Sequence, residues 1–296
     1  MMGRGPENHQ DMKVPKEDHI SRVPDFLYGA TAGFLPTIIT FPIYKTVFRQ
    51  QLHSSLIRQA IDQLRKEGFL KLYRGVAPPL LMRTFNGTLL FGVNGFFLNL
   101  LSSSSSTLIP LCVLPAVAGL GTGVVEALVF TPFERVQNVL QNGGNDPSLP
   151  SMKSVLARLR TETLGGGFYR AFIPILARNA MGSCIYFGLK DPISAALAEK
   201  GLPPMASSFL SGIVNSFMIS IPLYPLSVLT ANMQAAVVGD AARVGVRDSW
   251  KLLWEGRLNR SVRLLYRGGS LVIFRSCISW GITTAIYDQL RKRSTH

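Results

Sequence analysis

Residues 115–141 form the stretch PAVAGLGTGVVEALVFTPFERVQNVLQ, which combines an apolar run, closely spaced glycines and an internal proline, Pro132. Two other segments of the chain share this plan. Pro42 lies 90 residues before Pro132, and Pro225 lies 93 residues after it. Because self-similarity at a fixed period is typical of repeat architectures, the sequence predicts three similar units.

Three further features recur with these prolines. A glutamine follows each proline by nine residues, a glycine precedes each by thirteen, and a Tyr-Arg pair recurs at spacings of 96 and 97 residues. The glutamines are Gln51, Gln141 and Gln234, the glycines are Gly29, Gly119 and Gly212, and the pairs begin at Tyr73, Tyr169 and Tyr266. Each glycine has another small residue four positions later, which allows close helix packing in lipid. Since proline bends a helix, we expect three bent helices that converge at one end of a bundle.

The composition is typical of a membrane protein. Hydrophobic residues make up 47% of the 296 residues and charged residues only 16%. Residues 26–44, 84–125 and 201–239 contain no charged side chain. A spanning helix needs about 20 apolar residues, so these stretches suggest five spans, and residues 276–287 suggest a sixth. The alternative, buried helices of a large soluble protein, accounts poorly for such long uncharged runs.

Each long helix is expected to be followed by a basic amphipathic segment and a second span. The predicted long helices are 25–53, 112–141 and 206–236, the basic segments 58–67, 151–162 and 247–256, and the second spans 78–101, 174–198 and 271–292. Residues 45–83, 134–178 and 232–275 carry net charges of +6, +3 and +5, which account for the total of +14. The three basic connections therefore belong on one side of the membrane and both termini on the other.

Several classes of protein are disfavoured. Three widely spaced cysteines give no disulfide framework, and the four histidines give no zinc-ligand spacing, so no metal site is expected. The sequence has no catalytic triad at a recognisable spacing and no P-loop, so we expect neither an enzyme nor a bound cofactor. The uncharged spans argue against nucleic-acid binding. Residues 1–24 are polar, lack the apolar core of a secretory signal, and are expected to form a disordered tail.

The repeated motifs resemble those of the mitochondrial carrier family. The family signature is Pro-x-[Asp/Glu]-x-x-[Lys/Arg], followed by an acidic-Gly pair and an aromatic-basic-Gly triplet. The copies in this chain are PIYKTVFRQQ with EGFLKLYRG, PFERVQNVLQ with GGGFYRA, and PLSVLTANMQ with YRG. The resemblance covers about residues 25–292. It implies an all-α membrane protein with six transmembrane helices in three pseudo-symmetric repeats, 25–101, 112–198 and 206–292, and three short matrix-side helices.

The resemblance also implies a location and a mode of action. A carrier of this family is a monomer of the mitochondrial inner membrane, with both termini toward the intermembrane space and a central cavity that opens alternately to either side. Its surroundings are the lipid bilayer, with cardiolipin as a candidate partner. The segments FPIYKTVFRQQL, FERVQNVLQ and RSCISWGITTAIYD are similar to the divergent subgroup that contains the mitochondrial NAD carrier. The expected cargo is NAD or a related nucleotide. The alternatives are another anion, such as a smaller nucleotide or a carboxylate, and a transport-inactive scaffold.

The family closes its matrix side with a ring of ion pairs, of which little survives here. The acidic positions hold Tyr44, Glu134 and Ser227, and the basic positions hold Val47, Gln137 and Thr230. We expect hydrogen bonds among Tyr44, Gln137, Glu134 and Thr230 to replace part of this ring, braced by Gln51, Gln141 and Gln234. The opposite gate of the family is represented by Asp191, Tyr287, Asp288 and Arg291.

The substrate-contact level that the family implies lies nine residues after each tyrosine of the Tyr-Arg pairs. It holds Met82, Arg178 and Arg275, with Arg83 and Asn179 next along. An arginine at membrane depth must line water or meet a partner, and its guanidinium matches phosphate or carboxylate oxygens. Glu126 is expected to contact the substrate or to form a structural ion pair with an arginine. One acid, two arginines and the apolar Met82 suit a dinucleotide with a pyrophosphate and a positive ring.

Overall fold

The computed structural model describes residues 22–104, 110, 112–237 and 244–294, and the regular structure in these residues is entirely helical. The long helices are α1 (Arg22–His53), α4 (Ala77–Ser104), α5 (Leu114–Gln141), α7 (Phe172–Glu199), α8 (Pro204–Ala235) and α11 (Gly269–Ser294). The short helices are α2 (Ile57–Glu67), α3 (Phe69–Leu72), α6 (Met152–Arg160), α9 (Val246–Lys251) and α10 (Val262–Leu265), with a 3₁₀ turn at Gly143–Asn145 and a π-helical segment at Leu252–Arg257.

The chain repeats the order long helix, short basic helix, long helix three times, as the periodicity predicts. The observed long helices begin and end within a few residues of the predicted bounds. The third connection departs from the simple prediction, because α9 gives way to a π-helical segment and then to α10. The predicted tail, residues 1–24, lies almost wholly outside the described residues.

Three of the long helices, α5, α7 and α8, are long and apolar enough to cross a membrane. Judged on their described residues by the same length and hydropathy criteria, α1, α4 and α11 do not qualify as membrane spans. Large apolar side chains are exposed on several long helices, including Phe85, Phe96 and Ile173, which are 60%, 63% and 66% exposed. So much exposed apolar surface is unusual for a soluble monomer and suits contact with lipid.

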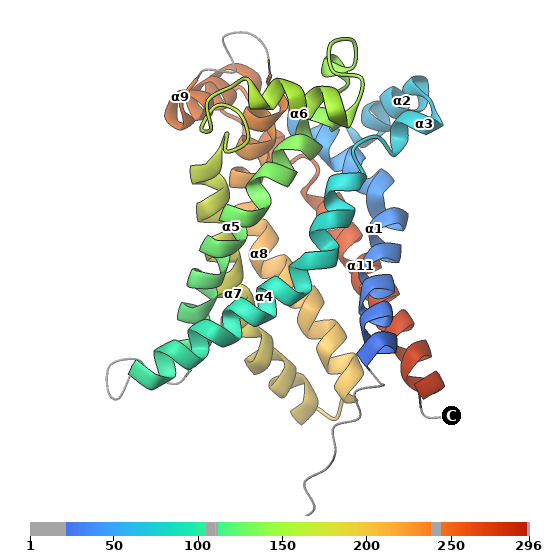
Figure 1. The fold of residues 1–296 in the computed structure, drawn as a ribbon, viewed down its shortest axis with the longest axis vertical. Helices are drawn as coiled ribbons and strands as arrows, with labels where there is room; N and C mark the ends of the chain where they lie inside the picture. The colour runs from blue at the N-terminus through green and yellow to red at the C-terminus, as the bar shows by residue number, and fades with distance from the viewer. Residues whose placement is uncertain (1–21, 105–109, 111, 238–243, 295–296) are drawn as a thin grey trace, which may run out of the picture.

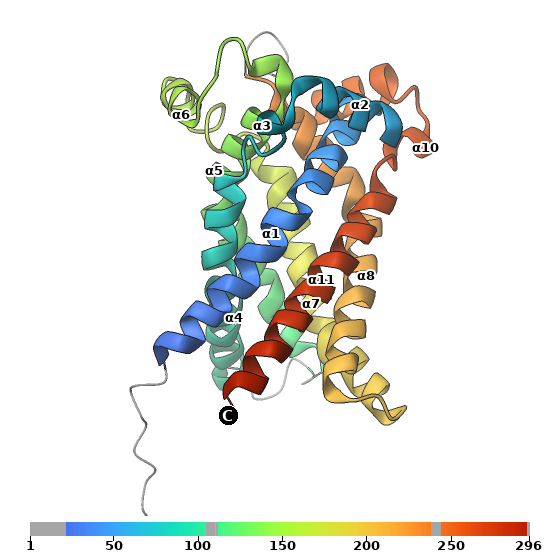
Figure 2. The same ribbon diagram turned by 90° about the vertical axis from the view of Figure 1, so that its right-hand side faces the viewer.

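The bundle is tightly packed at one end. The short helices gather there, whereas the long helices diverge toward the opposite end (Figure 1). The beginning of α1 and the end of α11 both lie at the diverging end (Figure 2). Residues 45–50 of α1 and 135–141 of α5 are all buried, so the closely packed region coincides with the C-terminal halves of these helices.

The arginines of the Tyr-Arg pairs join the repeats at the packed end. Each one donates to a backbone carbonyl of the next repeat. For Arg170 and Arg267 this carbonyl lies at the C-terminal end of that repeat's first helix, and for Arg74 it lies in the connection between α5 and α6. The donors and acceptors are Arg74 and Leu149 at 2.5 Å, Arg170 and Met233 at 3.0 Å, and Arg267 and Ser54. Helix C-termini carry carbonyl groups without an intrahelical partner and a partial negative charge, which explains the cationic donors Arg170 and Arg267. Each repeat is therefore bonded to the next one, and the third repeat is bonded back to the first.

The recurring prolines lie inside the long helices, with Pro42 in α1, Pro132 in α5 and Pro225 in α8. A proline has no N–H for the carbonyl four residues earlier, so that carbonyl needs another donor. In the second and third repeats the tyrosine of the Tyr-Arg pair supplies it. The bonds run from the Tyr169 hydroxyl to the Leu128 carbonyl at 3.1 Å and from the Tyr266 hydroxyl to the Ile221 carbonyl at 3.0 Å. The proline and the Tyr-Arg pair therefore recur together because the tyrosine donates to the carbonyl that the proline leaves without a donor.

The paired small residues of α5 pack against the backbone of α7, as the sequence predicts. A Cβ atom added at Gly119 would lie 2.5 Å from the Ser183 carbonyl oxygen. One added at Gly123 would lie 2.5 Å from the Cα atom of Ala180. These two glycines fix how closely α5 and α7 approach and therefore how their side chains align.

Replacing Gly123 with alanine should destabilise the protein, because a methyl group would meet rigid backbone of α7. Overpacking of this kind costs about 1–3 kcal/mol. Gly95→Ala is the matched control, since nothing lies within 4 Å of a Cβ added there. Thermal unfolding of the detergent-purified proteins should show a lower Tm only for Gly123→Ala. Equal midpoints for the two variants would contradict this packing.

Tyr169→Phe should also lower the Tm, because the Leu128 carbonyl then loses its donor, at a cost of about 1–3 kcal/mol. In a Pro132→Ala background the helix can form its own hydrogen bond to this carbonyl. The same Tyr169→Phe change should therefore cost much less there. Four proteins, wild type, both single variants and the double variant, form the thermodynamic cycle. Equal losses in the two backgrounds would show that the tyrosine does not replace the missing donor.

Candidate functional site

A cavity of about 300 Å³ lies among five of the long helices, toward the packed end of the bundle. All six side chains that the sequence singled out for the substrate-contact level line it. They are Met82 and Arg83 from α4, Glu126 from α5, Arg178 and Asn179 from α7, and Arg275 from α11. Residues far apart in the chain thus meet in one place.

The strongest interaction in the cavity joins two of its walls. The Arg178 guanidinium forms a bidentate ion pair with Glu134, with Nη1 to Oε1 at 2.9 Å and Nη2 to Oε2 at 2.8 Å. The Asn179 side-chain oxygen accepts a further bond from Arg178 Nε at 3.2 Å. Both partners are largely buried, with 22% and 15% of their side chains exposed. Parallel bonds of this kind are the strongest form of carboxylate recognition by arginine.

Arg275 is less well paired than Arg178. Its guanidinium carbon lies 5.3 Å from the centre of the Tyr44 ring, a cation–π arrangement. Its Nε atom is buried and has no hydrogen-bond partner among the described residues. A buried donor without a partner is costly, so this group is available to an oxygen-rich ligand.

Glu126 forms no arginine ion pair within the part of the chain that the structure describes. Its Oε2 atom instead accepts a hydrogen bond from the Ser183 hydroxyl at 3.2 Å. Of the two alternatives for Glu126, the structural ion pair with an arginine is not formed among the described residues. Glu134, one of the predicted gate residues, is the acid that pairs with Arg178.

The predicted matrix-gate residues are only partly connected. Tyr44, Glu134 and Gln137 line the floor of the cavity, and Gln137 lies beside the Tyr44 hydroxyl. The buried Thr230 hydroxyl has no partner among the described residues, and Ser227 bonds back to its own helix. The expected hydrogen-bonded ring is therefore not formed as a single network, because the Glu134 carboxylate is engaged by Arg178.

The three glutamines differ in what they contact. Gln234 accepts from Asn138 at 2.6 Å and donates to the Arg170 carbonyl at 3.0 Å, so it ties α8 to α5 and to the second connection. Gln51 lies beside the Tyr224 hydroxyl. Gln141 is fully buried, and its side-chain atoms have no hydrogen-bond partner within the described chain.

The opposite gate is described only in part. Asp191 is exposed on α7. The side chains of Tyr287, Asp288 and Arg291 lie outside the described residues, so their predicted role stays a prediction.

Six further residues line the cavity that sequence reasoning did not assign to it. They are Thr37, Thr40, Phe41, Pro79, Asn86 and Phe130. Helical spacing contained the signal for some of them. Thr37, Thr40 and Tyr44 share one face of α1, since residues three and four apart are neighbours on a helix.

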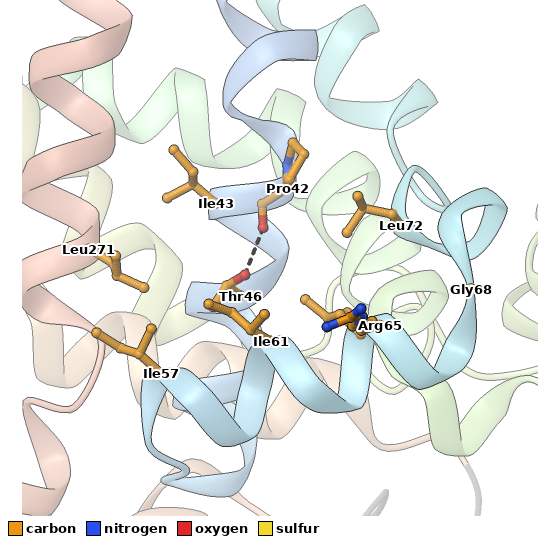
Figure 3. Close-up of a pocket in the computed structure, with 10 residues that line it drawn as sticks. Pro42, Ile43, Thr46, Ile57, Ile61, Arg65, Gly68, Leu72 and Leu271 are labelled. Atoms are coloured by element: carbon orange, nitrogen blue, oxygen red, sulfur yellow. Dashed lines mark hydrogen bonds between the residues drawn. The ribbon is translucent and has the colours of Figure 1, made fainter.

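A larger hollow of about 620 Å³ lies elsewhere, between α1, α2 and α11. Figure 3 shows that its lining is mainly aliphatic, with Ile57 and Ile61 of α2 facing Leu271 of α11. Beside them the Thr46 hydroxyl donates to the Pro42 carbonyl at 2.9 Å (Figure 3). This hollow lacks the convergent charged groups of the central cavity. The described residues also contain no cluster of three or more His, Cys, Asp or Glu side chains that could hold a metal.

Comparison with known proteins agrees with this architecture. A family model described as mitochondrial carrier protein matches residues 18–105, 112–201 and 202–296. Solute carrier family 25 member 53 of Homo sapiens is 46% identical over 273 residues, which cover 91% of this chain and 87% of that protein. The mitochondrial nicotinamide adenine dinucleotide transporter SLC25A51 of Mus musculus is 35% identical over 285 residues, covering 93% and 92%. SLC25A52 of Homo sapiens, described as the same kind of transporter, is 33% identical over 280 residues, covering 94% and 92%. These relatives fall in the subgroup that the motifs indicate. A chain with three such repeats, a central cavity lined from five helices and relatives of this identity belongs to the mitochondrial carrier family.

Proposed function

We propose that this protein carries NAD or a related nucleotide across the mitochondrial inner membrane by alternating access. The observation that carries the proposal is the cavity in which Arg83, Arg178 and Arg275 converge. Three cationic side chains at the end of a hollow bundle favour a substrate with several negative oxygens. The named cargo of two relatives, nicotinamide adenine dinucleotide, has this chemistry.

The proposed topology has six membrane spans, α1, α4, α5, α7, α8 and α11. The beginning of α1 and the end of α11 lie at the diverging end of the bundle, and the basic connections gather at the packed end (Figures 1 and 2). By the positive-inside rule basic connections face the inner compartment, which for the mitochondrial inner membrane is the matrix. We therefore place the packed end in the matrix and both termini in the intermembrane space.

We assign each part of the substrate to particular side chains of the cavity. Arg178 and Arg275 bind phosphate oxygens, with Arg83 as a further donor. Glu126 accepts hydrogen bonds from ribose hydroxyls or faces a positive ring, and Met82 provides an apolar surface. Three arginines face two glutamates, so the lining has one excess positive charge for an anionic cargo.

The Glu134–Arg178 pair couples this recognition to gating. Glu134 on α5 holds Arg178 on α7 at the packed end, in the state described here. A phosphate competes for the same two guanidinium nitrogens that Glu134 occupies. Binding therefore releases Glu134 and loosens the contact between α5 and α7 at the matrix end. A substrate can drive such a change only through its greater affinity for the state in which the pair is broken.

The hollow between α1, α2 and α11 suits a lipid acyl chain in the proposed membrane orientation. Its aliphatic lining includes Ile57, Ile61 and Leu271, and the basic Arg65 lies at the same site, where it can meet a lipid phosphate. The bilayer, with cardiolipin as one of its anionic lipids, is the proposed partner, and the carrier acts as a monomer.

Uptake of labelled NAD into liposomes that contain the purified protein tests the proposal. Arg178→Ala or Arg275→Ala should reduce affinity at least about thirtyfold, because truncating one side of a buried charged contact costs about 2–5 kcal/mol. Arg260→Ala is the matched control, since that side chain is 71% exposed and pairs with Glu255, which is also at the surface. If folded wild-type protein takes up another anion but not NAD, that anion replaces NAD as the cargo. If it takes up no anion at all, the result favours the scaffold alternative.

Glu134→Gln should separate stability from substrate binding. Removing the carboxylate leaves Arg178 buried without its counter-charge, so the Tm of the free protein should fall. The rise in Tm on adding NAD should become larger than in wild type, because the ligand no longer competes with Glu134 for Arg178. Glu255→Gln, at an exposed ion pair, should change neither quantity. An unchanged or smaller ligand-induced shift in Glu134→Gln would refute the competition.

A further inference from the structure

A second compartment of about 260 Å³ adjoins the arginine-lined cavity. The two share Glu126, Arg178 and Asn179. The remaining walls of the second compartment are Leu90 of α4, Gly182, Ser183 and Tyr186 of α7, and Ile219 of α8. Within the described chain no residue of α8 lines the first cavity, so the second compartment is the one that reaches α8. Arg178 lies where they meet.

The face of α7 that lines the second compartment has a charged end, a glycine and an aromatic end. Arg178, Gly182 and Tyr186 recur every four residues, so Tyr186 lies about 12 Å along the helix from Arg178. Gly182 contributes no side chain to the lining between them. A Cβ added at Gly182 would be in ordinary van der Waals contact, at 3.6 Å, with Ile219 and Leu223, so α8 covers this stretch and leaves little room for a larger side chain. The compartment therefore extends from the guanidinium to the tyrosine ring.

The chemistry of this lining suits a nucleoside. Tyr186 offers an aromatic surface, and Phe187 contacts its ring edge-on with centroids 5.1 Å apart, which restrains it. Leu90 and Ile219 provide apolar walls beside it. Glu126 and Ser183 are hydrogen-bonded to each other at 3.2 Å and lie between the ring and Arg178 on the lining, where ribose hydroxyls need partners.

We propose that the Tyr186 compartment binds one nucleoside of a dinucleotide, while the phosphates lie at Arg178 and the second nucleoside occupies the arginine-lined cavity. This inference rests on the proposed nucleotide cargo. The volumes of the two compartments are about 300 and 260 Å³. Ligand sites in proteins usually have volumes of about 300–1,000 Å³, so each compartment alone is small. A dinucleotide fills both compartments and a mononucleotide only one. The protein should therefore select dinucleotides over mononucleotides.

The test measures how NAD, nicotinamide mononucleotide and AMP compete with labelled NAD for the reconstituted protein. Wild type should bind NAD more tightly than either mononucleotide. Tyr186→Leu removes the ring and keeps apolar bulk, so it should weaken NAD about fivefold or more, the range of a lost base–aromatic stack. At least one mononucleotide, bound in the arginine-lined cavity, should change less than twofold. Tyr186→Phe keeps the ring and should retain the wild-type preference.

A second variant tests whether the nucleoside needs the space beside Gly182. Gly182→Val fills the gap between Arg178 and Tyr186, so it should also weaken the dinucleotide selectively. Arg178→Ala should weaken dinucleotides and mononucleotides alike. The subsite is refuted if folded Tyr186→Leu and Gly182→Val proteins keep wild-type NAD affinity, or if they weaken all three nucleotides equally. A wild-type protein that binds no nucleotide would overturn the proposed function and, with it, this inference.

Discussion

Backbone carbonyls that lack a helical donor must find another partner where water is scarce, and the repeated motifs of this chain meet that constraint. The tyrosines Tyr169 and Tyr266 bond the carbonyls that Pro132 and Pro225 leave free. The adjacent arginines bond carbonyls at or after the first helices of the neighbouring repeats. The second and third motifs therefore support their own bent helices, and all three motifs hold the next repeat. The packed end of the bundle, and the cavity that ends there, depend on these bonds.

The cavity combines two uses of one arginine. Arg178 belongs to the proposed substrate-contact level, yet in this structure its two terminal nitrogens are engaged by Glu134. The one acid that this chain keeps at the family's matrix-ring positions therefore pairs with α7 and not with another helix that carries ring positions. It links α5 to α7, the two helices whose approach Gly119 and Gly123 make possible. Gate and binding site are thus adjacent parts of the same contact.

Sequence reasoning located the elements well and their mutual alignment less well. Periodicity and charge gave the long helices and placed Arg178 and Arg275 at one level, because both follow a repeated motif by the same spacing. It left open whether Glu126 pairs with an arginine, and it did not predict that Glu134 pairs with Arg178. Glu126 and Glu134 lie two turns apart on α5, and the choice between them depends on the register of α5 against α7. That register follows from backbone contacts at Gly123, which one-dimensional spacing does not contain. The tyrosine–carbonyl bonds were missed for the same reason.

A structure of the protein determined with NAD bound tests the central claim most directly. The account predicts a phosphate oxygen within hydrogen-bonding distance of the Arg178 terminal nitrogens and a Glu134 carboxylate that no longer contacts them. Nucleotide density elsewhere in the protein, with the Glu134–Arg178 pair intact, would contradict it.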